Sequence, residues 1–131
     1  MVEHYQELLQ QANKVIIITP IWWNDLPGML KGFFDKVMKM NFAYRATKTG
    51  VKGLLTKIQQ LTIITTSTSP TWYLKLFCGN AVKSVFLKAS VKQMGIKNTS
   101  WLNFGSIGKQ SLSKRQAYLS DLSKRLNIMA S

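Results

Sequence analysis

The hydrophobic residues of the chain alternate between strand-like and helix-like patterns. The run from Val15 to Thr19 is a continuous series of β-branched residues, which predicts a strand buried on both faces of a parallel sheet. A turn over residues 20–25 follows it. We expect a helix to begin near Pro27. The N–H groups of a first helical turn have no intrahelical partner, so a proline there, which has no N–H, breaks no helical hydrogen bond. Apolar residues then recur at helical spacing, namely Leu30, Phe33, Phe34 and Val37.

Further elements are predicted before and after this unit. A helix over residues 3–12 precedes the first strand, and two more strands are expected over Leu61–Thr66 and Ser100–Phe104. Asn80 is expected to cap a helix over Ala81–Met94, with Gly95 as its C′ residue. The residues expected to face inward on that helix are Val82, Val85, Phe86 and Ala89.

The remaining segments complete the pattern. Met40 to Lys57 contains two glycines among polar and basic residues and is interpreted as a long loop. Ser113 and Gln116 match a capping box that opens the last helix, whose apolar residues are Leu119, Leu122 and Leu126. The order αβαβαβα predicts an α/β fold with a parallel three-stranded sheet and helices on both faces. We expect residues 1–131 to form a single domain.

One motif spans the first strand and the helix after it. From Pro20 to Val37 it reads P-I-W-W-x-x-x-P-x-x-L-K-G-F-F-D-K-V, and it is followed in order by Asn41-Phe42-Ala43-Tyr44, Gly50, Gly53-Leu54-Leu55 and LTIITTS at residues 61–67. These segments resemble the flavodoxin-like NAD(P)H:quinone oxidoreductases, with their general stress and drug-modulator relatives. The resemblance covers nearly the whole chain and implies a flavodoxin-like three-layer sandwich.

The resemblance also implies a cofactor, a reaction and site residues. It implies a flavoprotein that passes two electrons from NAD(P)H through FMN to a quinone or a similar acceptor. FMN is expected and not FAD, because no segment is large enough to supply an additional adenosine-binding domain. The residues implied to contact the flavin ring are Pro20, Ile21, Trp22, Trp23, Thr66, Ser67, Thr68 and Ser69, with Phe42 and Tyr44 on the substrate side and Tyr73 as a proton or hydrogen-bond donor.

Two of these assignments have structural alternatives. Trp22 and Trp23 adjoin a strand and are interpreted either as ring contacts or as core or interface aromatics. Tyr73 either serves the flavin or packs with Trp72 as an aromatic pair.

The sequence also departs from the family pattern. Ser67 and Thr68 stand where the family often has glycines, so side chains are expected to crowd a backbone that approaches the flavin. The sheet of the family has the strand order 2-1-3-4-5. This sequence has no segment that matches the family's first two strands, or the loop after the first strand that binds the flavin phosphate. Losing charge-assisted hydrogen bonds of ~1.5–3 kcal/mol each would weaken FMN binding or abolish it. The strand at Val15–Thr19 would then be an exposed apolar edge, which predicts a homodimer or a cover from another segment.

Charge is distributed unevenly along the chain. The formal net charge is +13, and from Lys36 onward sixteen basic residues face the single acid Asp121. Such an excess attracts nucleic acid, phosphates or an anionic membrane by its long-range field. The interpretations are a solubilising surface, non-specific nucleic-acid binding, or recognition of the phosphates of a pyridine nucleotide.

The composition excludes several other chemistries. Cys78 is the only cysteine and His4 the only histidine, so an internal disulfide, a metal site and a Ser-His-Asp triad are not expected. Asp35 is expected to pair with Lys31 four residues earlier. No apolar run is long enough for a membrane span, and we expect a cytoplasmic protein. The alternative to the enzyme is a truncated flavin-free paralogue acting as a basic interaction module.

Overall fold

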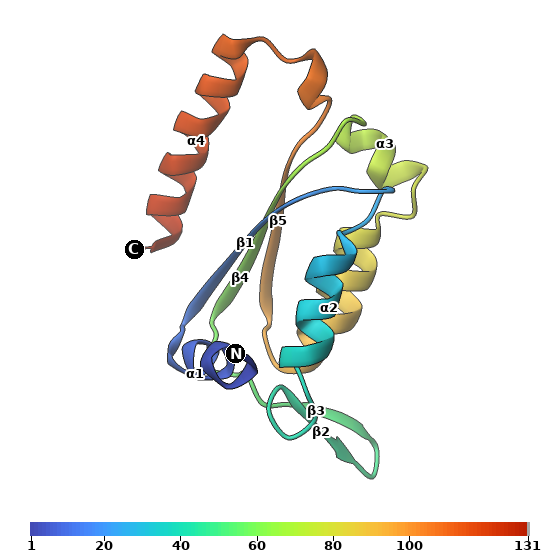
Figure 1. Ribbon diagram of the computed structural model, residues 1–131, viewed down its shortest axis with the longest axis vertical. Coiled ribbons are helices and arrows are strands. Elements are labelled where there is room, and N and C mark those ends of the chain that lie inside the picture. The colour runs from blue at the N-terminus through green and yellow to red at the C-terminus, as the bar shows by residue number, and fades with distance from the viewer. Residues whose placement is uncertain (131) are drawn as a thin grey trace.

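The computed structural model describes residues 1–130, and the side chains of residues 1–127. Its elements, labelled in Figure 1, are α1 (Val2–Gln11), β1 (Lys14–Pro20), α2 (Gly28–Val37), β2 (Tyr44–Thr47), β3 (Gly50–Gly53), β4 (Gln60–Thr66), α3 (Thr71–Leu76), η1 (Val82–Val91), η2 (Lys92–Met94), β5 (Asn98–Phe104), η3 (Ile107–Lys109) and α4 (Leu112–Ala130). Strands β1, β4 and β5 form a parallel sheet in the order β1-β4-β5. The predicted flavodoxin-like α/β architecture is confirmed.

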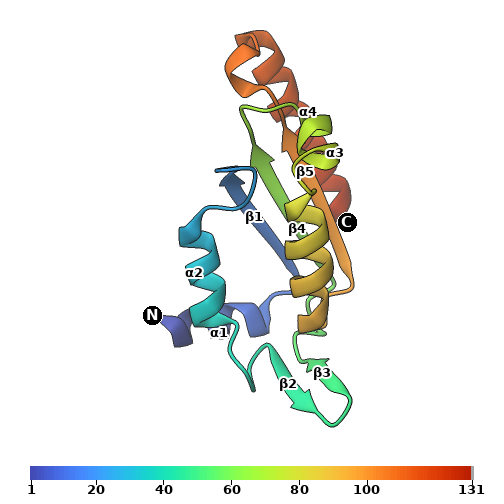
Figure 2. The same ribbon diagram turned by 90° about the vertical axis from the view of Figure 1, so that its right-hand side faces the viewer.

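The layers are visible in two perpendicular views. Helices α2 and η1 cover one face of the sheet, and α4 stands over the opposite face (Figures 1 and 2). Helix α1 lies near the beginning of β1 and contacts α2, and the β2–β3 hairpin projects beyond the same end of the sheet (Figure 2). Within the described chain, no helix is long and apolar enough to cross a membrane.

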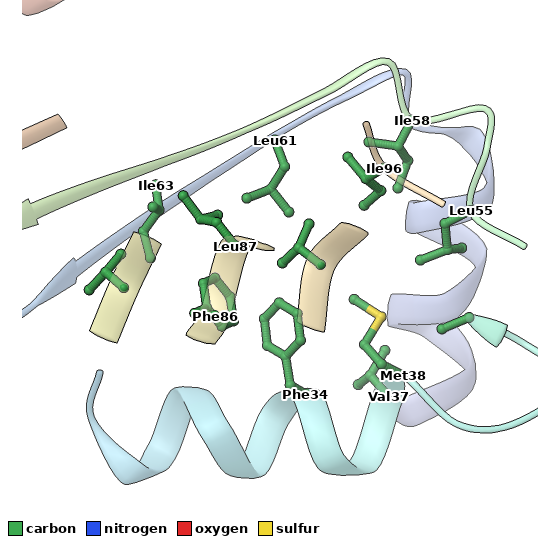
Figure 3. Packing of buried hydrophobic residues seen from close by; sticks show 13 residues of the cluster. Phe34, Val37, Met38, Leu55, Ile58, Leu61, Ile63, Phe86, Leu87 and Ile96 are labelled. Atoms are coloured by element: carbon green, nitrogen blue, oxygen red, sulfur yellow. The ribbon is translucent and has the colours of Figure 1, made fainter. Parts of the chain in front are cut away.

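The core lies between the sheet and the two helices α2 and η1 (Figure 3). Leu61 and Ile63 of β4 are almost completely buried and face the aromatic pair Phe34–Phe86, whose rings meet edge to face at 4.9 Å. Each such side chain contributes about 1.5–3 kcal/mol when it leaves water. The central strand β4 is therefore the best protected part of the sheet.

Strand β1 lies at an edge, because it pairs only with β4. Val15 and Ile17 pack against the core, whereas Ile16 is 51% and Ile18 77% exposed. The prediction that this strand is buried on both faces is therefore wrong for one face. The expectation of an exposed apolar edge is confirmed.

The segment from Met40 to Lys57 is not a long loop. It contains an antiparallel hairpin in which Tyr44 pairs with Gly53 and Thr47 with Gly50. Gly53 has a packing role, because a Cβ at this position would lie 2.2 Å from the backbone nitrogen of Gly95. The hairpin thus fastens the end of α2 to the turn before β5.

The helix predicted over Ala81–Met94 is wound differently from expectation. Residues 82–91 form a π-helix, and a short 3-10 turn ends at Gly95, whose φ of +98° confirms it as the terminating residue. The buried residues are Val82, Phe86, Leu87 and Val91, whereas Val85 and Ala89 are exposed. The i→i+5 bonding of a π-helix moves the inward face by about one residue per turn, which the 3.6-residue pattern did not anticipate.

Two predicted caps are corrected. Asn80 adopts a φ of +51° and makes no side-chain cap bond to the helix that follows. The last helix begins at Leu112, so Ser111 is its cap, and the Oγ of Ser111 accepts a bond of 3.3 Å from the N–H of Lys114. Ser113 already lies inside the first turn and forms no capping box.

The exposure of the last helix also differs from expectation. Leu119 is 63% exposed, although its spacing predicts an inward position. The helix contacts the sheet through Tyr118, whose ring stacks on Phe104 at 4.2 Å. Burial raises the pKa of the Tyr118 hydroxyl.

The winding of η1 can be tested by a matched pair of substitutions. Leu87→Ala should lower the free energy of unfolding by about 2–5 kcal/mol, because it empties a buried position. Val85→Ala, on the exposed side of the same helix, should change it by less than about 0.5 kcal/mol. Urea denaturation followed by circular dichroism measures both, and a larger loss for Val85→Ala would contradict the π-helical register.

Candidate functional site

The first loop of the candidate site follows β1. The N–H of Ile21 donates to the carbonyl of Thr66 at 2.8 Å, which ties this loop to the end of the neighbouring strand. Trp22 and Asp25 exchange two backbone hydrogen bonds of 2.9 and 3.0 Å around Trp23 and Asn24. Both central residues have positive φ, at 51° and 63°, which is the pattern of a type I′ turn.

The turn places both tryptophans in solvent. Trp23 stands at its tip with 99% of its surface exposed, and Trp22 is 59% exposed. The interpretation of these residues as core aromatics is therefore wrong. Ring contact and interface contact remain as their possible roles.

The second loop follows β4 and is fixed from below by a polar network. Ser67 is 4% exposed, and its hydroxyl donates to the carbonyl of Ser69 at 2.7 Å. The side-chain amide of Asn103 donates to Ser67 Oγ and to Thr71 Oγ1, both at 2.9 Å. Asn103 Oδ1 in turn accepts a bond of 2.7 Å from the hydroxyl of Thr65. Asn103 thus links both ends of the loop to the adjacent strand.

The inward position of Ser67 bears on the fit of a flat ring. Its side chain points into the network and so does not crowd the outer side of the loop, where family members often have glycine. Thr68 is exposed, and its side chain remains at the surface. The expectation that these two side chains crowd a bound flavin stays a prediction, and the hydrogen bonds of Ser67 favour an unobstructed loop at that position.

A third loop, after β5, packs closely against the second. The N–H of Ser106 donates to Ser69 O at 3.1 Å, and the N–H of Ile107 donates to Ser67 O at 3.0 Å. A Cβ on Gly105 would lie 2.7 Å from the backbone nitrogen of Thr71. The three strand ends therefore form one connected edge, the position where open α/β sheets bind ligands.

Free backbone donors lie along this edge. Among the described residues, the N–H groups of Trp23, Thr68 and Ser69 donate to no other group of the chain. Preorganised N–H groups of this kind stabilise a negative charge on a bound ligand. Beside the first loop is an apolar hollow of about 410 Å³, lined by Ile18, Thr19, Pro20, Trp22, Pro27, Met29, Leu30 and Phe33. These features fit one edge and one face of a flat heteroaromatic ring.

Tyr73 lies at the same end of the sheet, on α3 directly after the second loop. Its ring is 41% exposed, stacks on Phe77 at 5.6 Å and meets Trp72 edge to face at 6.0 Å. The aromatic pair with Trp72 is therefore present, although neither ring is buried.

Phe42 and Tyr44 lie elsewhere. They follow α2 and pack against the core at the amino ends of the strands, where the hairpin projects (Figures 1 and 2). Within one chain, the structure does not bring them to the loops that carry the tryptophans. The predicted ion pair between Lys31 and Asp35 is present on the exposed side of α2.

Comparison with known proteins gives a consistent result. A model of the flavodoxin-like fold family matches residues 1–126. A Haemophilus influenzae protein named as an uncharacterized NAD(P)H oxidoreductase is 26% identical over 106 residues, covering 81% of this chain and 52% of that protein. The FMN-dependent NADH:quinone oxidoreductase 1 of Bacillus cereus is 29% identical over 103 residues, covering 73% of this chain and 46% of that protein.

A solved structure is also similar. Smu.1420 from Streptococcus mutans superposes with a TM-score of 0.82 at 33% identity, covering 94% of this chain and 64% of that one. The chain spans about half the length of the two curated relatives.

The contribution of the hydrogen-bond network beneath the second loop to stability can be tested by a matched pair of substitutions. Asn103→Leu should lower the free energy of unfolding by about 1–3 kcal/mol, because the Thr65 hydroxyl loses its acceptor and the hydroxyls of Ser67 and Thr71 each lose a donor. Asn98→Leu, at the exposed start of the same strand, should change it by less than about 0.5 kcal/mol. Equal effects in urea denaturation would show that the network does not stabilise the loop.

Proposed function

The chain belongs to the flavodoxin-like fold family, and on this premise we propose that it binds FMN and passes two electrons from NAD(P)H to a quinone or a similar acceptor. The observation that carries the proposal is the set of unbonded N–H groups on two neighbouring strand ends, beside an apolar hollow. The names of the relatives support the cofactor and the reaction, since one is an FMN-dependent NADH:quinone oxidoreductase.

The two loops have distinct roles in this proposal. When bound, FMN supplies the ability to accept a hydride and to release two electrons to an acceptor. The segment Pro20–Trp23 orients the ring and excludes water from one of its faces. The segment Thr66–Ser69 donates its free N–H groups to the pyrimidine edge, where reduction places negative charge. Tyr73 lies next to the second loop, where its hydroxyl offers a donor to the flavin or to the acceptor.

The two loops provide no positively charged side chain to bind the phosphate of FMN. Neither loop contains a lysine or an arginine. Charge-assisted bonds to a phosphate contribute roughly 1.5–3 kcal/mol each, and every 1.4 kcal/mol changes the affinity about tenfold. We therefore expect the two loops alone to bind FMN weakly, with a dissociation constant of roughly micromolar.

We also propose that two copies form a homodimer through the edge of β1. Ile16 and Ile18 are exposed there, and β1 is the edge strand of the sheet order β1-β4-β5 in the described part of the chain. This edge also lies in the least basic part of the chain, since residues up to Asp35 contain four acids and two bases. Two strongly basic chains can approach each other there with the least repulsion.

A dimer would also account for the positions of Phe42 and Tyr44. They lie at the end of the sheet opposite to the loops, so they can border the substrate only from a second copy. An active site at or near the interface satisfies this condition. We place the dimer in the cytoplasm, where reduced pyridine nucleotides are supplied.

The charge excess favours a second candidate function. We propose that the basic surface binds nucleic acid without sequence preference, as an interaction module independent of flavin. It is supported by the net charge of +13 and by the near absence of acids after Asp35. Binding of this kind weakens steeply as salt rises.

The flavin proposal is tested by titrating the purified chain with FMN and following flavin fluorescence. Quenching should saturate at one FMN per chain, and Trp22→Ala should weaken binding by up to about tenfold, because one ring contact is worth about 0.5–1.5 kcal/mol. Trp72→Ala is the matched control, since Trp72 is similarly exposed on α3. No saturation up to about 100 µM FMN, well above the expected range, would refute flavin binding by these loops.

The dimer is tested by a matched pair of lysine substitutions. Ile18→Lys should shift the protein to a monomer, because it places a charge on the apolar edge of β1. Leu76→Lys changes a similarly exposed leucine on α3 and should leave the dimer intact. Light scattering at micromolar concentration measures both. A wild-type protein that remains a monomer under these conditions would refute the interface.

A further inference from the structure

The π-helix η1 (Val82–Val91) and the start of the turn η2 (Lys92–Met94) bring together three lysines. Lys83, Lys88 and Lys92 are spaced five and four residues apart. In an α-helix, Lys83 and Lys88 would point about 140° apart, at 100° per residue. The i→i+5 winding of η1 places residues four to five apart on one face. The winding that buries Leu87 and Val91 therefore aligns these lysines in one exposed stripe.

The stripe forms one wall of a groove beside β5. This groove, the lysine groove, has a volume of about 260 Å³ and is lined by Lys75, Lys83, Leu87, Lys88, Lys92, Thr99, Ser100 and Trp101. Lys75 reaches it from α3, with its Nζ 5.7 Å from the centre of the Trp101 ring. The opposite wall is β5, which pairs with β4 on one side only. An open strand edge with two hydroxyl residues therefore faces the lysines.

Among the described residues, no carboxylate lines the groove. Asp121 is the only acid after Asp35, and it pairs with Arg125 at 2.7 Å on α4. Helix α4 stands over the opposite face of the sheet from η1 (Figure 1). In the described part of the chain, the groove lysines form no ion pair, so their charges are left to attract an external anion.

We propose that the lysine groove binds the phosphodiester backbone of a nucleic acid. Lysine ammonium groups in a row contact successive phosphates as point charges, and the hydroxyl of Thr99 adds a neutral donor, whereas that of Ser100 is bonded to Thr62 Oγ1 at 2.9 Å. Trp101 is half-buried, its Nε1 donates to Thr65 Oγ1 at 2.8 Å, and Lys75 lies over its ring. The ring is thus closed to stacking with bases, so the groove reads the backbone and not the sequence.

This inference rests on the second candidate function and gives it a location. It is independent of the flavin proposal, because none of the residues that line the groove belongs to the loops after β1 and β4. A variant of the groove should therefore bind FMN as the wild-type chain does. Each proposal can fail without the other.

The test compares two triple variants that remove the same charge. The first variant removes the three charges of the stripe by combining Lys83→Gln, Lys88→Gln and Lys92→Gln. Lys109→Gln, Lys114→Gln and Lys124→Gln together are the control, since these exposed lysines lie in η3 and α4. Binding of a fluorescent 20-base-pair duplex is followed by anisotropy between about 50 and 200 mM salt, the range over which phosphate neutralisation dominates the affinity.

The slope of log affinity against log salt reports how many phosphates the protein neutralises. Removing the three charges of the stripe should reduce the steepness of that slope by about 3, because three phosphates are then no longer neutralised. The control variant should reduce the steepness by less than about 1. Replacing the same three lysines by arginine should preserve the slope, which shows that charge is responsible. Circular dichroism confirms that each variant is folded.

Three results would overturn the proposal. Equal reductions in the two triple variants would show that net charge binds DNA without a site. A wild-type affinity that does not fall with salt would refute nucleic-acid binding itself. Tight groove-dependent binding of an acidic peptide, with no groove-dependent binding of the duplex, would assign the groove to a protein partner along the β5 edge.

Discussion

The in-register parallel pairing of three strands is the constraint on which the rest of the structure depends. Pro20 pairs with Thr66, and Thr66 with Phe104, so the strands end at the same level. Three loops consequently begin side by side, and backbone bonds tie each to the next. This arrangement leaves a few N–H groups unbonded beside an apolar hollow. The proposed flavin site is a consequence of strand register more than of any single side chain.

The two edges of this sheet differ in chemistry. The edge of β1 is apolar and belongs to the part of the chain that carries most of the acids. The edge of β5 faces a row of lysines with no carboxylate among them. The proposed association of two copies and the proposed binding of a polyanion would therefore use opposite edges of the sheet. The uneven charge noted in the sequence has a spatial counterpart in this division.

Much of the fold follows from the sequence, because hydrophobic periodicity reports which residues face the core. The β-branched run at Val15–Thr19 and the spacing from Leu30 to Val37 were sufficient to predict β1 and α2. The register of η1 was not predictable in this way, because a π-helix departs from the 3.6-residue period. The exposure of Ile18 depends on strand order, which periodicity does not contain. The hairpin after α2 was missed because its strands are short and polar.

The site was predictable in part. The residues around Trp22 and Ser67 were singled out by their place after strands and by resemblance, whereas Asn103 was not. Its role depends on the pairing of β5 with β4, which places its amide beneath the second loop. An amide between the apolar residues Leu102 and Phe104, at the end of a predicted strand, is the signal that could have marked it. The separation of Phe42 from the loops likewise depends on the path of α2 through space.

The most direct test of the account is to record backbone amide chemical shifts of the isotopically labelled chain while FMN is added. The account predicts that the shifts of Trp23, Thr68 and Ser69 change most and saturate together, because their N–H groups acquire an acceptor. Changes confined to the lysine groove would show that FMN binds there through its phosphate alone. Either that result or unchanged shifts throughout would contradict the assignment of the flavin site to the carboxyl ends of β1 and β4.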